Sequence, residues 1–417
     1  MNLHLLYIDP GTGSALFSIL IGAAATSYFL GRALIIKLKV VLAGGKTSAN
    51  LKKTNPYVIY NEGRQYTNVF KPVLDEFEAR GIDLLYLSSA QDDPVLNENY
   101  HHVKGEYIGE GNRAFSRLNL LNADVVLMTT PGLDVYQLKR SKGVKHYAHV
   151  LHAPSDATMY RLFGIDYYDS VLLTGDYQAA DIMTLEKKRG ITPKKLTCVG
   201  CSYLDVYAKK IKNLPVETEH PFTVLVSPSW GPSALLSRYG EKLLDPLEKT
   251  GWRIIIRPHP QSKKSELTLL ERLQARYGDN EKILWDYDSE NIHSLSKADI
   301  MISDFSGIIY DFSFLFDKPV MYVKQNFDIR PYDADDLGDD AVEDLWQFKT
   351  LNEIGIELKE EEFSNIKQII QNAADNAELR EARKKAKDTA WQYPGEAGKR
   401  IADFMMETAE ALGNIQA

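Results

Sequence analysis

The stretch ADIMISDFSGIIYDFSFLFDKPVMY, residues 298–322, decides the fold of this chain. Its first part, residues 299–302, is a short and mostly apolar run that predicts a buried parallel strand, and a helical pattern resumes after Gly307. The polar turn between the strand and the helix contains Ser303 and Ser306. Free N–H groups and the positive end of the helix dipole make such a helix start attractive to anions. The stretch therefore predicts a phosphate site, and a diphosphate is its natural ligand.

Two aspartates of the same stretch are candidate ligand contacts. Asp304 and Asp311 are seven residues apart, about two helical turns, so they lie on nearly one face of a helix. A carboxylate at this place would hold a ribose hydroxyl or a polyol. In the alternative interpretation, Asp304 caps the helix and Asp311 is a solvated helix residue.

The composition indicates a folded protein with room for two domains. The 417 residues are 44% hydrophobic and 25% charged, which excludes wholesale disorder. The net charge of -8 gives no support to nucleic-acid binding, which is usually carried by basic domains. Cys198 and Cys201 form a lone C-x2-C pair, whereas structural zinc requires four ligands. We interpret both as ordinary reduced residues and expect neither a metal nor a cofactor.

The amino terminus carries a candidate membrane anchor. Residues 11–31 contain no charged side chain and are long enough to cross a bilayer as a helix. Six Lys and Arg residues and no acidic residue follow before Glu62. The positive-inside rule then predicts a single-pass protein of the inner, cytoplasmic membrane whose remainder is cytoplasmic. Two alternatives stay open: a cleaved signal peptide, which would normally carry Lys or Arg before the apolar run, and a helix lying in the membrane interface.

The rest of the chain alternates between short β-rich runs and amphipathic stretches, which predicts parallel sheets. The strands expected in the first series are residues 57–63, 82–89, 123–131, 145–154, 170–175 and 195–200. A polar segment with two prolines, residues 212–222, predicts a linker. The strands expected in the second series are residues 222–230, 252–260, 282–288, 299–302 and 319–324.

Two α/β halves of this kind are expected to face one another across a cleft, with their functional loops at the carboxyl ends of the strands. We divide the chain into a membrane anchor with a basic segment, a first Rossmann-like domain, a second Rossmann-like domain and a carboxyl-terminal helix. Their boundaries are residues 1–53, 54–212, 213–389 and 390–417.

Polar residues follow three expected strands of the second half. Ser227 and Ser229 follow one strand, Arg257 and His259 follow another, and the turn at residues 303–307 follows the third. Arg257 offers a fixed cation for a phosphate, and His259, which stands between two prolines, can donate to a bridging or leaving oxygen. The alternative for His259 is a structural role at a strand end.

In the first half, His152 is the candidate catalytic base. It lies at the end of an expected strand in the sequence YAHVLHAPSD, where Asp156 is close enough in sequence to orient it. His149 is expected inside the sheet. The alternative for His152 is a loop histidine that is bound to backbone.

The motifs SPSW, RPHP and ISDFSGIIYDFSFLFDKPVMYV together resemble the carboxyl half of the CDP-glycerol glycerophosphotransferases, the wall-teichoic-acid primases and polymerases, which have a GT-B fold. The resemblance is strong over residues 222–323. It is weaker over residues 57–206, where LHAPSDATMYRLFG is similar to the family's His-Gly segment and VGCSYLDV to its Gly-x-Pro-Arg-x-Asp turn.

The resemblance implies transfer of glycerol phosphate from CDP-glycerol to a hydroxyl of a lipid-linked saccharide, in the biogenesis of the cell envelope. It makes the first domain the acceptor domain and the second the nucleotide-donor domain. The family's amino-domain histidine matches His152, a base, and its RPHP histidine matches His259, a phosphate contact or acid. Its serine-rich turn matches Ser303, Asp304 and Ser306.

The chain departs from the family pattern at several places. Gly307 replaces the second serine, Gly231 stands where an arginine is common, Ala153 replaces the glycine after His152, and residues 201–204 lack the proline and arginine. A different nucleotide-activated alditol would be compatible with these changes. Two other functions stay open: a GT-B glycosyltransferase that uses a nucleotide sugar, and a non-catalytic nucleotide-binding scaffold of an envelope-assembly complex.

Overall fold

The computed structural model describes residues 26–27, 31, 55–215, 220–288, 290–324, 328–338, 341–374 and 376–414. The chain divides into two compact units, Met1–Thr54 and Asn55–Ala417. Apart from residues 26, 27 and 31, the expected membrane anchor and its basic segment lie outside the described residues. In the part of the chain that the structure describes, none of the helices combines the length and the apolar character that a membrane span requires.

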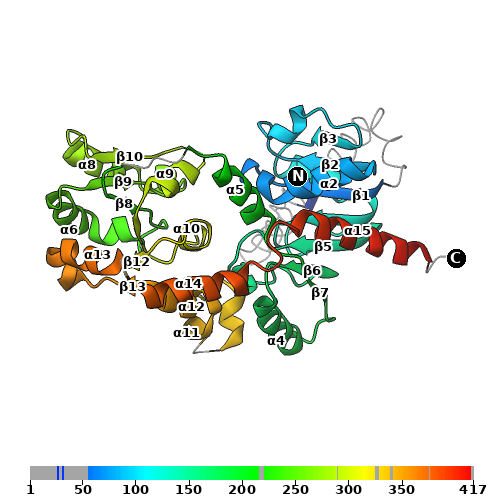
Figure 1. Ribbon diagram of the computed structural model, residues 1–417. Coiled ribbons are helices and arrows are strands. Elements are labelled where there is room, and N and C mark those ends of the chain that lie inside the picture. Colours follow the sequence, from blue (N-terminus) through cyan, green and yellow to red (C-terminus); the bar gives the residue numbers. More distant parts are fainter. Residues whose placement is uncertain are drawn as a thin grey trace, which may run out of the picture. The chain divides into compact units, whose positions relative to one another are not determined.

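The first sheet of the second unit has seven parallel strands in the order β3-β2-β1-β4-β5-β6-β7 (Figure 1). Its strands are β1 (Asn55–Asn61), β2 (Leu84–Ser88), β3 (Val103–Tyr107), β4 (Asn122–Met128), β5 (Gly143–Val150), β6 (Ser170–Leu173) and β7 (Lys195–Cys198). The helices of this part are α2 (Thr67–Arg80), α3 (Asn112–Leu118), α4 (Ala179–Arg189) and α5 (Ser202–Lys212). Because helices cover both faces, the central strands are buried on both sides and consist of near-continuous apolar runs.

The second sheet has six parallel strands in the order β10-β9-β8-β11-β12-β13. Its strands are β8 (Thr223–Val226), β9 (Arg253–Ile256), β10 (Ile283–Trp285), β11 (Ile300–Ser303), β12 (Val320–Tyr322) and β13 (Gly355–Glu357). The helices of this part are α6 (Leu235–Lys249), α7 (Ser262–Ser265), α8 (Leu267–Tyr277), α9 (Ile292–Lys297), α10 (Ile308–Phe316), α11 (Ala341–Asp344), α12 (Trp346–Ile354), α13 (Ile366–Ala374) and α14 (Ala377–Ala390). The expected linker lies between α5 and β8.

Each sheet has an apolar core on both faces. On one face of the first sheet, Phe70 and Phe77 of α2 pack together with Phe404 and Met405 of the last helix, α15 (Ala397–Asn414). On one face of the second sheet, α10 contributes Phe312 and other apolar side chains to a buried cluster. The apolar stripes of the helices therefore meet the apolar faces of the strands, as in other α/β layers.

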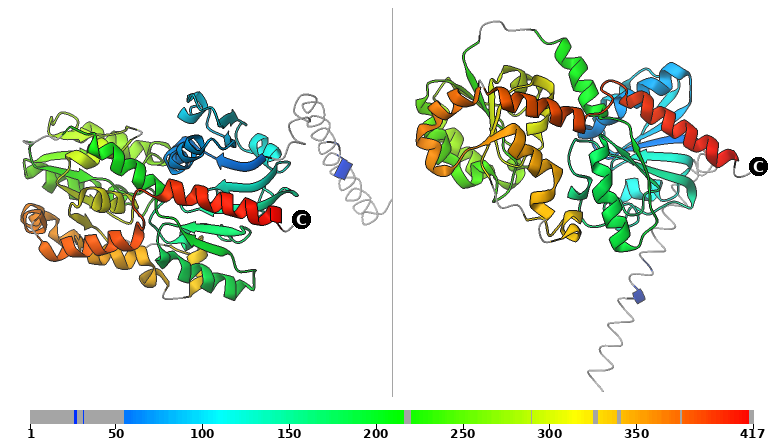
Figure 2. Two further views of the ribbon diagram at one scale, coloured as in Figure 1. Left: turned by 45° about the vertical axis from the view of Figure 1, so that its right-hand side comes forward. Right: turned by 60° about the horizontal axis from the view of Figure 1, so that its bottom comes forward.

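The carboxyl-terminal segment returns to the first sheet, where α15 lies beside α2 (Figure 2). The buried Asp205 of α5 holds this return in place. Its carboxylate accepts hydrogen bonds from Trp391 Nε1 at 2.9 Å, from the N–H of Gly395 at 2.6 Å and from the N–H of Ala397 at 3.1 Å. One carboxylate thus fixes both the end of α14 and the start of α15.

Two strands were not expected from the sequence. β3 has the sequence VKGEY and β13 has the sequence GIE, and each is the outermost strand of its sheet. An edge strand has only one neighbour and exposes polar side chains, so it lacks the apolar run that indicates a buried strand.

Candidate functional site

The expected strand-turn-helix of residues 298–322 is present as β11, a polar turn and α10. β11 lies between β8 and β12, and β9 lies beside β8. The loops that follow β9, β8 and β11 are therefore neighbours at the carboxyl edge of the second sheet. Ser303 is fully buried there, and its hydroxyl donates to the carbonyl of Ser227 at 2.6 Å. This bond joins the loop after β8 to the end of β11.

Asp304 is buried, and both oxygens of its carboxylate accept hydrogen bonds from backbone N–H groups. Oδ1 accepts from the N–H of Ser229 at 2.9 Å and from the N–H of Ser306 at 3.2 Å, and Oδ2 accepts from the N–H of Leu235 at 2.9 Å. Burial raises the pKa of Asp304, and these N–H groups oppose that rise. Leu235 is the first residue of α6, so Asp304 caps α6 rather than α10 and holds two loops together.

The start of α10 is the open part of this turn. Ser306 is half-buried, whereas Gly307 is exposed and stands at the N-cap position of α10. A Cβ added at Gly307 would meet no atom within 4 Å. The position next to Gly307 therefore has room for a side chain or a ligand atom.

Arg257 and His259 contact different partners. Arg257 is buried, and its Nη1 lies 2.5 Å from Asp286 Oδ2 while its Nη2 donates to the Asp288 carbonyl at 2.8 Å. The N–H of Gln261 donates to His259 Nδ1 at 3.1 Å. A neutral His259 that accepts at Nδ1 carries its proton on Nε2, so it offers a donor. Arg257 is thus engaged in an internal ion pair, and His259 is the better placed of the two for a phosphate oxygen.

The ring of His259 lies 6.2 Å from the ring of Trp230, whose side chain is half exposed. Burial lowers the pKa of His259, and the nearby Glu266 opposes that change. The same Glu266 accepts from the N–H of Gly231 at 2.8 Å. Gly231 has a φ of 97°, a conformation that favours glycine, which explains why a side chain is absent here.

Asp311 is buried inside α10 rather than solvated. Its Oδ2 accepts from the Tyr203 hydroxyl at 2.6 Å, and burial raises its pKa to about 7. Tyr203 belongs to α5, so this hydrogen bond connects α10 to the helix that precedes the linker. The alternative interpretation of Asp311 as a solvated helix residue is therefore wrong, and its expected role as a ligand contact stays a prediction.

His152 lies just after β5 at the carboxyl edge of the first sheet. Its Nδ1 is 3.0 Å from Thr129 Oγ1 and 3.2 Å from the Tyr160 hydroxyl, and its ring meets the edge of Tyr66 with 4.9 Å between ring centroids. Burial lowers the pKa of His152 to about 4, so the imidazole is neutral at pH 7. When Nδ1 carries the proton and donates to Thr129, Nε2 keeps the lone pair that a base requires.

Asp156 does not orient His152. Its carboxylate accepts from the N–H of Trp346 at 3.0 Å and from the N–H of Gln347 at 2.8 Å, so it caps α12. Sequence proximity suggested Asp156, but the groups that hold His152 come from the end of β4 and from Tyr160. His149 is fully buried within β5, as expected, and its Nε2 lies 3.1 Å from the Tyr160 hydroxyl.

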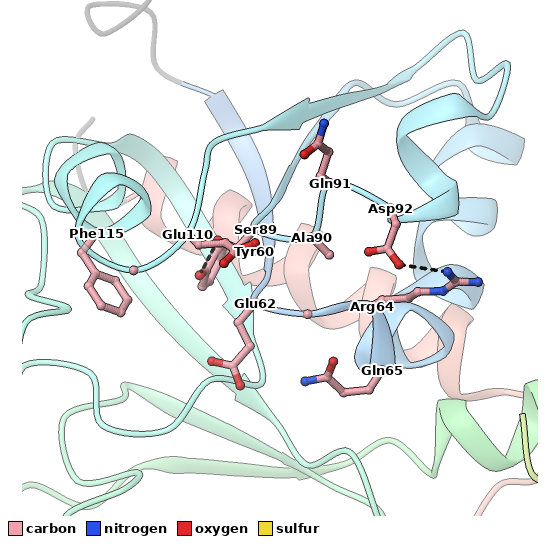
Figure 3. Close-up of a pocket in the computed structure, with 12 residues that line it drawn as sticks. Tyr60, Glu62, Arg64, Gln65, Ser89, Ala90, Gln91, Asp92, Glu110 and Phe115 are labelled. Atoms are coloured by element: carbon pink, nitrogen blue, oxygen red, sulfur yellow. Dashed lines mark hydrogen bonds and ion pairs between the residues drawn. The ribbon is translucent and has the colours of Figure 1, made fainter. Parts of the chain in front are cut away.

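A pocket of about 690 Å³ lies beyond the carboxyl ends of β1 and β2 (Figure 3). It is lined by Tyr60, Glu62, Gly63, Arg64, Gln65, Ser89, Ala90, Gln91, Asp92, Glu110, Gly111 and Phe115. Sequence reasoning did not select any of these residues. For the residues near β1 and β2, the available signal was their position at the carboxyl ends of expected strands, whereas Glu110, Gly111 and Phe115 follow β3, which was not expected.

Metal-binding side chains do not gather in the described part of the chain. Among the described residues, no group of three or more His, Cys, Asp or Glu side chains is arranged to hold an ion. Cys198 and Cys201 are free thiols, and Cys198 Sγ donates to Gln392 Oε1 at 3.0 Å.

Residues 209–407 match the model of the family described as CDP-Glycerol:Poly(glycerophosphate) glycerophosphotransferase. This part of the chain is similar to the CDP-glycerol glycerophosphotransferase family. The match confirms the resemblance of the motifs and the enzyme class, a glycerophosphotransferase-like transferase. All candidate residues of the second sheet lie inside the matched region, and His152 lies outside it.

Solved structures show a similar GT-B-like fold over both sheets. The wall teichoic acid polymerase TagF with CDPG is 13% identical with a TM-score of 0.53, and the match covers 91% of this chain and 98% of that chain. The UDP-GlcNAc 2-epimerase from Methanocaldococcus jannaschii in complex with UDP-GlcNAc and UDP is 14% identical with a TM-score of 0.56, and the match covers 84% of this chain and 99% of that chain. A putative UDP-N-acetylglucosamine 2-epimerase from Listeria monocytogenes is 14% identical with a TM-score of 0.53, and the match covers 84% of this chain and 95% of that chain. No curated protein matched the chain.

Proposed function

We propose that this glycerophosphotransferase transfers glycerol phosphate, or a related polyol phosphate, from a CDP-activated donor to a hydroxyl of a lipid-linked or envelope saccharide. The observation that carries the proposal is the family match over the three adjacent loops that follow β9, β8 and β11. A helix start with open space above it and a histidine that offers Nε2–H together suit a diphosphate.

The two sheets divide the work in this proposal. Residues 213–389 form the domain that binds the nucleotide donor, and residues 54–212 form the domain that binds the acceptor. Residues 390–417 supply the helix that returns to the first domain. Residues 1–53 anchor the enzyme to the inner membrane as a single pass, with its catalytic part in the cytoplasm; this rests on the uncharged run and the basic residues of the sequence.

His152 is the catalytic base. The acceptor hydroxyl oxygen attacks the β-phosphorus of CDP-glycerol, and its proton passes to Nε2 of His152. A new P–O bond forms to the acceptor, and the bond between the β-phosphorus and the bridging oxygen breaks. That oxygen leaves with the electron pair as part of CMP. Thr129 and Tyr160 fix the imidazole, because both contact Nδ1.

His259 and the start of α10 stabilise the charge that builds up on the leaving group. His259 Nε2–H donates to a diphosphate oxygen, and the N–H groups at Gly307 and Ile308 face the same charge. Ser227, Ser229, Ser303 and Asp304 hold these groups in position through the hydrogen bonds described above. Arg257 contributes indirectly through its ion pair with Asp286 and its positive charge.

A donor panel tests the proposal. Detergent-solubilised full-length protein is incubated with CDP-glycerol, CDP-ribitol, UDP sugars or GDP sugars, with and without a lipid extract from its host membrane. The proposal expects CMP release from a CDP-polyol that depends on the extract. Consumption of a UDP or GDP sugar instead would establish a glycosyltransferase. Tight binding of CDP-glycerol without turnover would establish a scaffold.

A further inference from the structure

The pocket at β1 and β2 has the size of a ligand site and is formed by one sheet edge. Its volume of about 690 Å³ lies within the range of roughly 300–1,000 Å³ that is typical of small-molecule sites. Glu62, Arg64 and Gln65 follow β1, whereas Gln91 and Asp92 follow β2. The pocket therefore occupies the carboxyl edge of a parallel sheet, where α/β folds bind their ligands.

The charge of the pocket disfavours an anionic ligand. Three carboxylates, Glu62, Asp92 and Glu110, line it, and Arg64 supplies the lone positive charge among the lining residues. Arg64 Nη1 lies 2.9 Å from Asp92 Oδ2, and Figure 3 shows the Arg64 side chain directed toward Asp92. The two remaining carboxylates would repel a phosphate, because like charges brought together cost energy.

The hydrogen-bonding and aromatic side chains of the pocket suit a carbohydrate. Figure 3 shows the ends of Glu62 and Gln65 directed toward the same space. Carboxylates and amides accept hydrogen bonds from hydroxyl groups, and an amide also donates two. Phe115 is half-buried and offers an aromatic surface, against which the C–H face of a sugar ring can pack. Gln91 also lines the pocket and carries a second amide.

The pocket lies at the same carboxyl edge of the first sheet as His152. The strand order β2-β1-β4-β5 places the pocket over two strands and His152 at the end of β5. Burial raises the pKa of Glu62, and the nearby Thr130 hydroxyl opposes that rise; Thr130 is the neighbour of Thr129, which contacts His152. Burial and the charge of Glu62 raise the pKa of Tyr66, and the ring of Tyr66 packs edge-on against the ring of His152. Glu62 of the pocket and His152 of the first sheet are thus connected through Tyr66 and through the neighbours Thr129 and Thr130.

We propose that this pocket binds the uncharged saccharide end of the acceptor, so that the enzyme adds glycerol phosphate to a neutral sugar and does not extend a chain of glycerol phosphates. Glu62 and Gln65 position the accepting hydroxyl, and Phe115 packs against the sugar ring. This inference rests on the proposed function and adds the chemical class of the acceptor. A poly(glycerol phosphate) primer carries one negative charge per unit and is rejected by the acidic lining.

Two kinds of acceptor distinguish an enzyme that modifies a neutral sugar from one that extends a chain of glycerol phosphates. Alkyl glycosides of neutral hexose and N-acetylhexosamine disaccharides form one panel, and alkyl-linked oligo(glycerol phosphate) primers form the other. We expect CMP release from CDP-glycerol with a member of the neutral panel, and a kcat/KM at least about tenfold lower with every phosphate primer. More efficient use of a phosphate primer would overturn the inference while leaving the proposed function intact.

Substitutions in the pocket test whether it binds the neutral acceptor. We expect Phe115→Ala and Glu62→Gln each to raise the KM for the neutral acceptor at least about tenfold, with an unchanged Kd for CDP-glycerol. Glu361→Gln, which removes an exposed carboxylate far along the chain, is the matched control and is expected to leave both constants as in the wild type. Glu110→Lys changes an exposed residue and is expected to improve the use of the phosphate primer. Wild-type acceptor KM in both Phe115→Ala and Glu62→Gln would overturn the inference.

Saturation-transfer NMR with the neutral glycosides reads binding without turnover. Saturation transfer to the sugar protons that weakens in Phe115→Ala supports the inference even if no acceptor of the panel is turned over. Absence of transfer from wild-type protein for every neutral glycoside would contradict it. Calorimetric titration of CDP-glycerol tests the proposed function separately, because the donor does not use this pocket.

Discussion

The carboxyl edges of the two sheets differ in how their polar residues are used. At the second sheet, the side chains of Ser303 and Asp304 form hydrogen bonds with backbone groups of neighbouring loops. The motif residues therefore hold these loops together around the exposed start of α10. At the first sheet, His152 is held from one side, and a large pocket lies two strands away. A recognisable motif can therefore mark the scaffold of a site, whereas the groups that face the ligand are fewer and less regular in sequence.

The largest effect is expected at the first sheet. His152→Ala should lower kcat for CMP release by about 10²–10⁴-fold, the usual contribution of a general base, while far-UV circular dichroism and the Kd for CDP-glycerol stay unchanged. His101→Ala, an exposed histidine of the same half, is the matched control. Near wild-type turnover of His152→Ala would show that the first sheet does not supply the base.

His259→Ala tests the open part of the second sheet. We expect kcat/KM for the donor to fall by roughly 10²-fold, since loss of one donor to developing charge has an effect of this order. His259→Gln keeps a donor and should recover part of the loss. The exposed His293→Ala is the control. Equal losses in the Ala and Gln variants would argue against a hydrogen-bond role.

Asp304→Ala tests whether the buried carboxylate holds the loops of the second sheet together. The free energy of unfolding should fall by roughly 2–3 kcal/mol, because buried N–H groups of Ser229 and Leu235 lose a charged acceptor. Urea unfolding followed by circular dichroism measures the change. Asp279→Ala, at an exposed position of the same half, should stay within about 0.5 kcal/mol of the wild type. An unchanged free energy of unfolding in Asp304→Ala would show that Asp304 does not hold the loops of the second sheet together.

The pH dependence sharpens the role of His152. Its pKa is lowered to about 4, so the base form is present above that pH, and the acid limb of kcat/KM should lie near pH 4 instead of near 6.5. The unfolded chain protonates this histidine near pH 6.5, so folding stability decreases as the pH falls below that value. Circular dichroism at each pH therefore accompanies the assay. An acid limb near 6.5 would place His152 in a more solvated site.

The smallest effect is expected at the open helix start. Gly307→Ser should change the free energy of unfolding by less than about 0.5 kcal/mol, because the added side chain meets no atom within 4 Å. Gly231→Ala should cost about 1 kcal/mol, because its φ is 97°. Thermal unfolding of the two variants compares them directly. A larger loss in Gly307→Ser than in Gly231→Ala would contradict the open turn.

The sequence predicted the buried parts of the fold well because apolar runs identify central strands. It missed β3 and β13, whose polar or very short sequences become strands only through pairing with a neighbour. The adjacency of the three loops of the second sheet was also expected from the sequence, and the strand order agrees with it.

The contacts of individual side chains were less predictable. Asp156 and its partner Trp346 are 190 residues apart, so no local pattern indicates that this aspartate caps α12. The same holds for Asp311 and Tyr203, and for the hydroxyls of Thr129 and Tyr160 that contact His152. Such contacts depend on how distant strand ends and helices meet, which sequence periodicity does not record.

We propose that the enzyme breaks CDP-glycerol at its β-phosphorus and transfers glycerol phosphate to a saccharide hydroxyl. Mass spectrometry of the products formed from CDP-glycerol and a neutral disaccharide glycoside tests this reaction. We expect CMP and a disaccharide that carries glycerol phosphate in equal amounts. Release of CDP, or transfer of glycerol without its phosphate, would contradict it.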